Sequence, residues 1–258
     1  MDSQLVMQIV NPKLFFGLLK FFWNMGLQLV MEITVNKNIV FKGIRQDMDA
    51  ILLGEYPFDS MFKAKNDIDS EQPLIFCPLQ IKKLNEYLKN FISGVGLELV
   101  FEYSVDNLNR LFCSKMKIGN EIFSTTGGQL IIPATQYREE YNDVTSEILC
   151  NSNKLLFSFT LQPQILQKVK TNQENKLSIF LLIVENGELL VFSDNEYQLI
   201  LTEDFVNLSD KDEYIKIDSR YLRYLTSDEV YQVQVGTKYI HFTAQSDKHE
   251  IFIAGTRD

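Results

Sequence analysis

The residue types that most often carry catalysis are sparse in this chain and are not spaced for it. The two histidines, His241 and His249, lie eight residues apart, in or beside one expected hairpin, and no HExxH, GxSxG, GxxxxGKS or GxxxxGKT motif occurs. Carboxylate pairs such as Asp47 with Asp49 lie in expected turns, where solvated acids are common. We therefore expect no catalytic residue, and only a metal-dependent nuclease whose site is assembled in space stays open.

The three cysteines, Cys77, Cys113 and Cys150, indicate neither a disulfide framework nor a zinc site, because their number is odd and no CxxC spacing occurs. A reducing compartment is the expected environment of such a chain. The run Gly94-Val95-Gly96 is too short for a dinucleotide fingerprint and is typical of a helix stop. We expect no metal and no cofactor.

The distribution of charge is more informative than its sum. The chain carries 34 acidic and 25 basic residues, a net charge of −9, which ordinarily argues against a nucleic-acid partner. The four predicted helices, at residues 12–23, 78–91, 162–175 and 219–226, nevertheless hold nine basic residues against two acidic ones, so they carry +7 and the remainder −16. The nine are Lys13, Lys20, Lys82, Lys83, Lys89, Lys168, Lys170, Arg220 and Arg223.

The spacing of these cations places them opposite the apolar side of each helix. In the first helix Lys13, Gly17, Lys20 and Asn24 follow an i, i+4, i+7, i+11 course, while Leu14, Leu18, Leu19 and Phe22 point elsewhere. In the second, Leu84, Tyr87, Leu88 and Phe91 are the expected buried stripe, and in the third Ile165, Leu166 and Val169 are. A solvated surface would explain one such helix, but the recurrence in all four favours a basic surface that meets something anionic.

The elements that must position these side chains occur in one order twice: strand, helix, three strands, short strand, helix, three strands. In the first copy we predict strands at 5–10, 27–35, 39–45, 50–56, 74–77, 97–105, 110–118 and 121–125. In the second we predict strands at 155–161, 177–184, 188–192, 197–202, 214–217, 230–235, 239–244 and 250–253, with a tight hairpin turn at Glu185-Asn186-Gly187. The chain is therefore expected to be α+β, with two tandem domains at 1–126 and 155–258, each with two helices on antiparallel sheets, and a surface connector at 127–154.

Residues 14–31 form the longest mostly apolar stretch. Lys20, Asn24 and Gln28 interrupt it, and Gly26 falls where a helix should end. A buried helix followed by a core strand is favoured over a membrane span, so we expect no membrane partner.

With these elements assigned, the chain resembles the DNA sliding clamps, in the two-domain form of proliferating cell nuclear antigen and the T-even phage clamps. Residues 44–52 (IRQDMDAIL) are similar to the family's Asp-containing turn before an apolar strand, and residues 219–226 (SRYLRYLT) to its last helix. Residues 251–255 fall where the family has an apolar strand entering its tail. Gly255 stands where eukaryotic members have proline, which weakens an assignment to a cellular rather than a viral clamp.

The resemblance implies a homotrimeric ring with the basic helices inside, so that the nine cations face duplex DNA without reading its sequence. It also implies a DNA polymerase and a clamp-loader ATPase as partners, no enzymatic activity, and an intracellular location at the site of replication. Outside this class, a β-rich viral structural or host-interaction protein without DNA-tracking activity stays the alternative. A clamp-like factor that works as a monomer or dimer is a third hypothesis.

Two further sets of site residues are implied by the resemblance alone. The subunit contact corresponds to Arg110, Leu111, Phe112 and Cys113 on one edge strand and to Tyr197, Leu199 and Leu201 on another. A pocket for short apolar peptides of partner proteins corresponds to Ile44, Met48, Leu130, Ile131, Ile132, Phe252 and Ala254. Ordinary core or rim packing would explain the second set equally well.

Overall fold

The computed structural model describes most of the chain and divides it into two compact units. The described residues are 3–24, 28–45, 48–66, 73–76, 81–82, 86, 98–105, 111–119, 130–133, 144–172, 179–186, 188–193, 196–199, 204–245, 249–254 and 256–257. The first unit comprises residues 1–44 and 54–141, and the second comprises residues 45–53 and 142–258. The grouping of segment 45–53 with the second unit was not anticipated from sequence, and the predicted connector at 127–154 stays a prediction.

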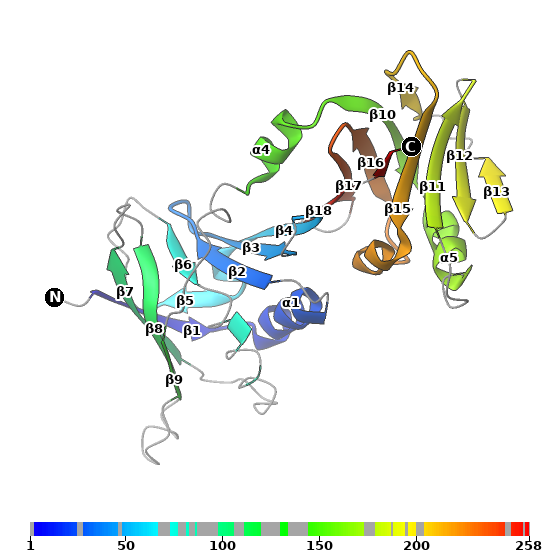
Figure 1. Cartoon of the computed structure of the whole chain (residues 1–258). Coiled ribbons are helices and arrows are strands. Elements are labelled where there is room, and N and C mark those ends of the chain that lie inside the picture. The colour runs from blue at the N-terminus through cyan, green and yellow to red at the C-terminus, as the bar shows by residue number, and fades with distance from the viewer. Residues whose placement is uncertain are drawn as a thin grey trace. The chain divides into compact units, whose positions relative to one another are not determined.

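The first unit is built mainly of strands, and the helix α1 (Pro12–Asn24) lies beside them (Figure 1). Its elements are β1 (Ser3–Ile9), α1 (Pro12–Asn24), β2 (Gln28–Ile33), β3 (Asn38–Ile44), β4 (Ala50–Pro57), the 3-10 helix η1 (Phe58–Ser60), β5 (Phe62–Ala64), β6 (Leu74–Phe76), β7 (Glu98–Val105), β8 (Leu111–Gly119) and β9 (Leu130–Pro133). The strand order is β4-β3-β2-β6-β8-β7-β1-β5, with β9 paired to β8. β6 and β8 run parallel, whereas the pairs made by β1, β7 and β9 are antiparallel.

α1 forms because its capping and its apolar spacing agree. Asn11 precedes Pro12, the first helical residue, and its side-chain oxygen accepts a hydrogen bond from the Leu14 N–H at 3.2 Å. Phe15, Leu19 and Phe22, at i, i+4 and i+7, are buried. The helix is fixed to the unit by aromatic contacts, since the Phe22 ring stacks on that of Phe41 in β3 and the Phe15 ring meets that of Phe62 edge-on.

The second unit contains two antiparallel sheets. Its elements are α4 (Ser146–Asn151), β10 (Leu155–Leu161), α5 (Pro163–Asn172), β11 (Ile179–Glu185), β12 (Glu188–Ser193), β13 (Glu196–Leu199), β14 (Val206–Asn207), β15 (Glu213–Asp218), the 3-10 helix η4 (Ser219–Tyr224), β16 (Tyr231–Gly236), β17 (Tyr239–Ala244), β18 (His249–Ala254) and β19 (Thr256–Arg257). One sheet contains the run β14-β10-β16-β17-β18, and the other has the order β13-β12-β11-β15-β19. β11, β12 and β13 lie side by side in Figure 1.

Most predicted elements are confirmed, with a few corrections. The turn between β11 and β12 has Asn186 at φ 52°, the positive value that a tight hairpin requires. The last predicted helix, at 219–226, is instead a six-residue 3-10 helix, and the predicted connector contains both β9 and the helix α4. The predicted strand at 121–125 lies outside the described residues, as does most of the predicted helix at 78–91, of which residues 81, 82 and 86 are helical.

Apart from the apolar β9, the strands that the sequence did not predict are short. β5 lies in the polar stretch after η1, and β14 and β19 have two residues each, too short for a periodic signal. A bilayer-spanning helix is not found in the described part of the chain, whose longest helix, α1, has 13 residues.

Candidate nucleic-acid interface

The exposed side of α1 is the best-defined basic surface in the structure. Lys13 and Lys20 are exposed, Gly17 between them is exposed, and the buried residues of the helix lie on its other side. A Cβ placed on Gly17 would meet nothing within 4 Å, so the backbone here is open to a close approach from outside. Neither Lys13 nor Lys20 takes part in an ion pair within the described residues. The predicted basic face of this helix is therefore present and accessible.

Of the other seven predicted cations, only Lys82 has a described side chain. Lys82 is exposed beside the buried Ile81. Lys168 and Lys170 lie in α5, and Arg220 and Arg223 lie in η4, but the side chains of all four are outside the described residues, as are Lys83 and Lys89 altogether. Leu166 of α5 is buried as predicted, and Ile165 is half-buried. The assignment of all nine cations to a DNA surface remains a prediction.

η4 is anchored within the second unit by a polar contact that sequence analysis missed. Arg45 Nη1 donates to the Tyr221 hydroxyl oxygen at 2.8 Å, and the Tyr221 hydroxyl donates to the Asp49 carboxylate. The Arg45 guanidinium also lies 5.4 Å from the centre of the Tyr221 ring and 3.5 Å from Asp49 Oδ1. Burial raises the pKa of Tyr221 to about 12, and the hydrogen bond to Asp49 contributes to the rise.

This contact corrects the expectation for Asp49, whereas Asp47 lies outside the described residues. Asp49 was assigned to a solvated turn, but its side chain is only 29% exposed and its carboxylate accepts a hydrogen bond from Tyr221. The turn itself is tight, because the Met48 N–H donates to the Arg45 carbonyl and Met48 has a φ of 54°. A separation of 172 residues explains why spacing gave no signal. The contact is structural: the Tyr221 hydroxyl joins η4 to the segment 45–53 through hydrogen bonds with the charged Arg45 and Asp49 side chains.

The residues predicted to line a peptide pocket differ in their exposure. Met48 and Ala254 are half-buried, and the Ala254 N–H donates to the Asp49 carbonyl at 2.8 Å, so the structure brings these two neighbourhoods together. Ile44 and Phe252 are fully buried, and the Phe252 ring stacks on His241, so both pack in the interior rather than line a surface. Leu130, Ile131 and Ile132 form β9, and their side chains are outside the described residues.

Sequence comparison alone identifies nothing, because no protein-family model and no curated protein matches the chain. Solved structures do match. PCNA from Thermococcus kodakaraensis is 11% identical with a TM-score of 0.57, over 98% of this chain and 100% of that chain. The structure of the C-terminal region of FEN-1 bound to A. fulgidus PCNA is 8% identical with a TM-score of 0.60, over 99% of both chains. The DNA polymerase sliding clamp from Pseudomonas aeruginosa is 10% identical with a TM-score of 0.60, over 97% of this chain and 64% of that chain.

The chain has the DNA sliding-clamp fold. Because the match spans nearly all of its residues, the α+β architecture predicted from sequence is confirmed. The identities of 8–11% are too low to carry function with them, so the role of this clamp-like chain rests on its own residues.

The two strands expected to form the subunit contact differ in whether one of their backbone edges is unpaired within the described sheets. β13, with Tyr197 and Leu199, is an edge strand of its sheet, as expected, whereas Leu201 lies outside the described residues. β8 is not a free edge: β7 pairs along one side, and on the other β6 pairs with residues 111–112 and β9 with residues 115–118. Leu111 and Cys113 are also buried, and Arg110 is outside the described residues. The expected edge on this strand is therefore corrected to an interior position.

The apolar run 130–132 explains that correction. It was assigned to a surface connector, but as β9 it satisfies the backbone groups of β8 that would otherwise face outward.

No group of three or more His, Cys, Asp and Glu side chains suited to a metal ion occurs among the described residues.

Proposed function

We propose that this chain is a DNA polymerase sliding clamp, a processivity factor that encircles duplex DNA as a homotrimer and tethers a polymerase to it. The observation that carries the proposal is the exposed basic side of α1 in a chain of net charge −9 that has the sliding-clamp fold. Lysines on a helix surface attract phosphates without reading bases, so such a surface permits sliding. The acidic remainder would repel DNA from every other surface.

The partners follow from this role. A ring must be opened and closed around DNA, so we propose a loader ATPase as one partner. The other partner is the polymerase that the clamp tethers. Among the residues predicted to line the peptide pocket, the half-buried Met48 and Ala254 are the candidates accessible to it. No catalysis by the chain itself is proposed. Its place of action is wherever the DNA of its source is copied.

The test is a charge reversal on α1. We expect Lys13→Glu combined with Lys20→Glu to preserve folding and molar mass but to reduce stimulation of the cognate polymerase on primed circular DNA at least tenfold at physiological salt. Two phosphate-facing cations are lost, and two like charges are added. The measurement is primer extension with excess template, so that each product reports processivity.

A matched control makes the same change in net charge elsewhere. Lys63→Glu with Lys211→Glu alters two exposed lysines that lie outside every helix, in β5 and in the loop before β15. This variant should stimulate the polymerase like the unmodified chain. Equal activity of the two double variants, whether both retained or both lost, would contradict the assignment of the DNA surface to α1.

A further inference from the structure

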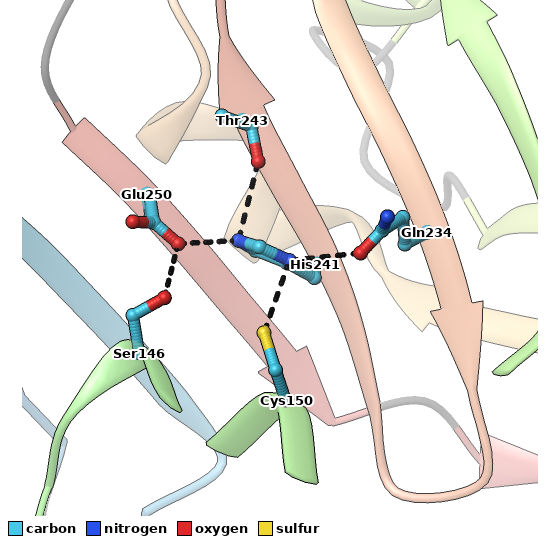
Figure 2. Close-up of polar contacts among 6 residues, drawn as sticks. All are labelled: Ser146, Cys150, Gln234, His241, Thr243 and Glu250. Carbon is cyan, nitrogen blue, oxygen red and sulfur yellow. Dashed lines mark hydrogen bonds and ion pairs between the residues drawn. The ribbon is translucent and has the colours of Figure 1, made fainter. Parts of the chain in front are cut away.

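A cluster of six polar side chains in the second unit is not used by the proposed function. Ser146 and Cys150 lie one helical turn apart on α4, Gln234 on β16, His241 and Thr243 on β17, and Glu250 on β18 (Figure 2). Gln234 and Thr243 lie directly opposite His241 and Glu250 in their strand pairs, so the four strand residues share one side of the sheet. α4 packs on that side through these contacts and its buried Leu149.

The imidazole ring of His241 is held by polar contacts at both of its nitrogens. Its Nε2 lies 2.7 Å from Glu250 Oε2, and because a carboxylate can only accept, Nε2 carries the proton. The hydrogen bond from His241 lowers the pKa of Glu250, so this group stays a carboxylate at neutral pH. The Phe252 ring stacks on the imidazole with a centroid separation of 4.1 Å and an interplanar angle of 6°. When Nε2 carries the only ring proton, Nδ1 is the basic atom of the imidazole, and the Gln234 Oε1 atom lies 3.4 Å from it.

That basic atom faces a thiol. Cys150 Sγ lies 3.7 Å from His241 Nδ1, within reach of an S–H···N hydrogen bond, and Cys150 is an exposed residue whereas His241 is buried. Burial raises the pKa of the Cys150 thiol, and the Glu250 charge adds to the rise, while the Ser146 hydroxyl opposes it. The thiol thus keeps its proton near neutral pH and depends on a base to react. Nucleophile, base and a carboxylate that orients the base are all in position.

We propose that Cys150 is a covalent modification site at which His241 acts as general base, and that it accepts small conjugated carbonyl electrophiles. The Sγ–H proton passes to Nδ1 as sulfur adds to the β-carbon of the electrophile. The π electrons of its carbon–carbon double bond move to the α-carbon, which then takes the proton back from Nδ1. Glu250 stabilises the transient imidazolium as a positioning residue. The reaction requires no oxidant and releases no leaving group.

The consequence for the structure is local. An adduct on Sγ removes the Cys150–His241 contact, one of the polar contacts that hold α4 on β17 and β18. The inference does not rest on the proposed clamp function, and neither outcome of its test bears on DNA binding.

The test uses N-ethylmaleimide on the full chain, with labelling of the Cys150 peptide followed by mass spectrometry between pH 7 and pH 8.5. A thiol that reacts only as its own thiolate gains about tenfold in rate per pH unit below its pKa. With His241 as base, the labelling rate should rise less than about threefold per pH unit. The reason is that the protonated thiol reacts by giving its proton to the imidazole, so the rate does not follow the fraction of free thiolate. A tenfold slope in the unmodified chain would overturn the proposal and needs no variant.

Variants separate the base from its surroundings. His241→Asn should restore the tenfold slope and slow labelling at pH 7 at least about tenfold. Glu250→Gln, which weakens the contact that orients the base, should give an intermediate slope. Cys113 is buried, so its labelling reports loss of folding in any sample. Equal slopes for His241→Asn and the unmodified chain would refute the role of the base.

Discussion

At the scale of single residues, Tyr221 shows how one hydroxyl can fix a distant segment. The hydroxyl accepts a hydrogen bond from Arg45 and donates one to Asp49. Tyr221→Phe therefore removes both hydrogen bonds, and the Arg45 guanidinium and the Asp49 carboxylate each lose one partner. We expect a loss of about 1–2 kcal/mol in the free energy of unfolding at pH 7, measured by denaturant titration. Tyr214→Phe, at an exposed tyrosine, should change it by less than about 0.5 kcal/mol.

The raised pKa of Tyr221 adds a pH dependence at the same scale. Because the folded-state pKa of about 12 exceeds the ordinary value of 10.0, the folded chain holds this proton more tightly than the unfolded chain. The stability that this contact contributes is complete below pH 10 and is lost as the pH rises through 12. Stability should therefore fall less steeply over that range in Tyr221→Phe than in the unmodified chain. Parallel curves would contradict the anchoring role of the hydroxyl.

At the scale of elements, Asn153 joins the end of α4 to the hairpin of β16 and β17. Its Nδ2 donates to the Tyr239 carbonyl at 2.9 Å, and its Oδ1 accepts from the N–H groups of Lys238 and Tyr239 at 2.9 and 3.0 Å. A Cβ on Gly236 would lie 2.2 Å from that Oδ1, so glycine is needed there for close approach. Asn153→Ala and Gly236→Ala each disturb the same contact, and each should cost about 2–3 kcal/mol.

Their combination is the sharper measurement. Once Asn153 is truncated, the alanine at 236 has nothing to displace, so the double variant should be no more than about 1 kcal/mol less stable than Asn153→Ala. Unfolding titrations of the four proteins give the coupling free energy. Additive losses would indicate that Gly236 matters for its backbone conformation rather than for the room it gives Asn153.

At the scale of the whole molecule, the proposed role requires closure of a ring. A head-to-tail trimer should have a molar mass near three times 30.0 kDa, measured by light scattering on a sizing column. Its affinity for duplex DNA, once loaded, should fall steeply as salt rises, because phosphate contacts release counterions. A monomer or a dimer at micromolar concentration would favour the third hypothesis, a clamp-like factor that does not close as a trimer.

The sequence by itself determined most of the helices and strands, and it determined that the exposed side of α1 carries positive charge. Alternating apolar residues specified most strands, Asn186-Gly187 specified a hairpin, and the i, i+4, i+7 spacing specified the buried and basic sides of α1. These are local properties, since each depends on residues within a few positions of one another. They were enough for the fold class and for the electrostatic argument.

Only the tertiary structure decided which distant residues meet. Cys150 lies 91 positions from His241, and Asp49 lies 172 from Tyr221, so no spacing rule could join them. The run 130–132 had a strand-like composition, but its pairing with β8 depends on an edge that exists only after folding. Two-residue strands and a 3-10 turn are likewise products of their surroundings, because so few residues carry too little intrinsic preference to specify them.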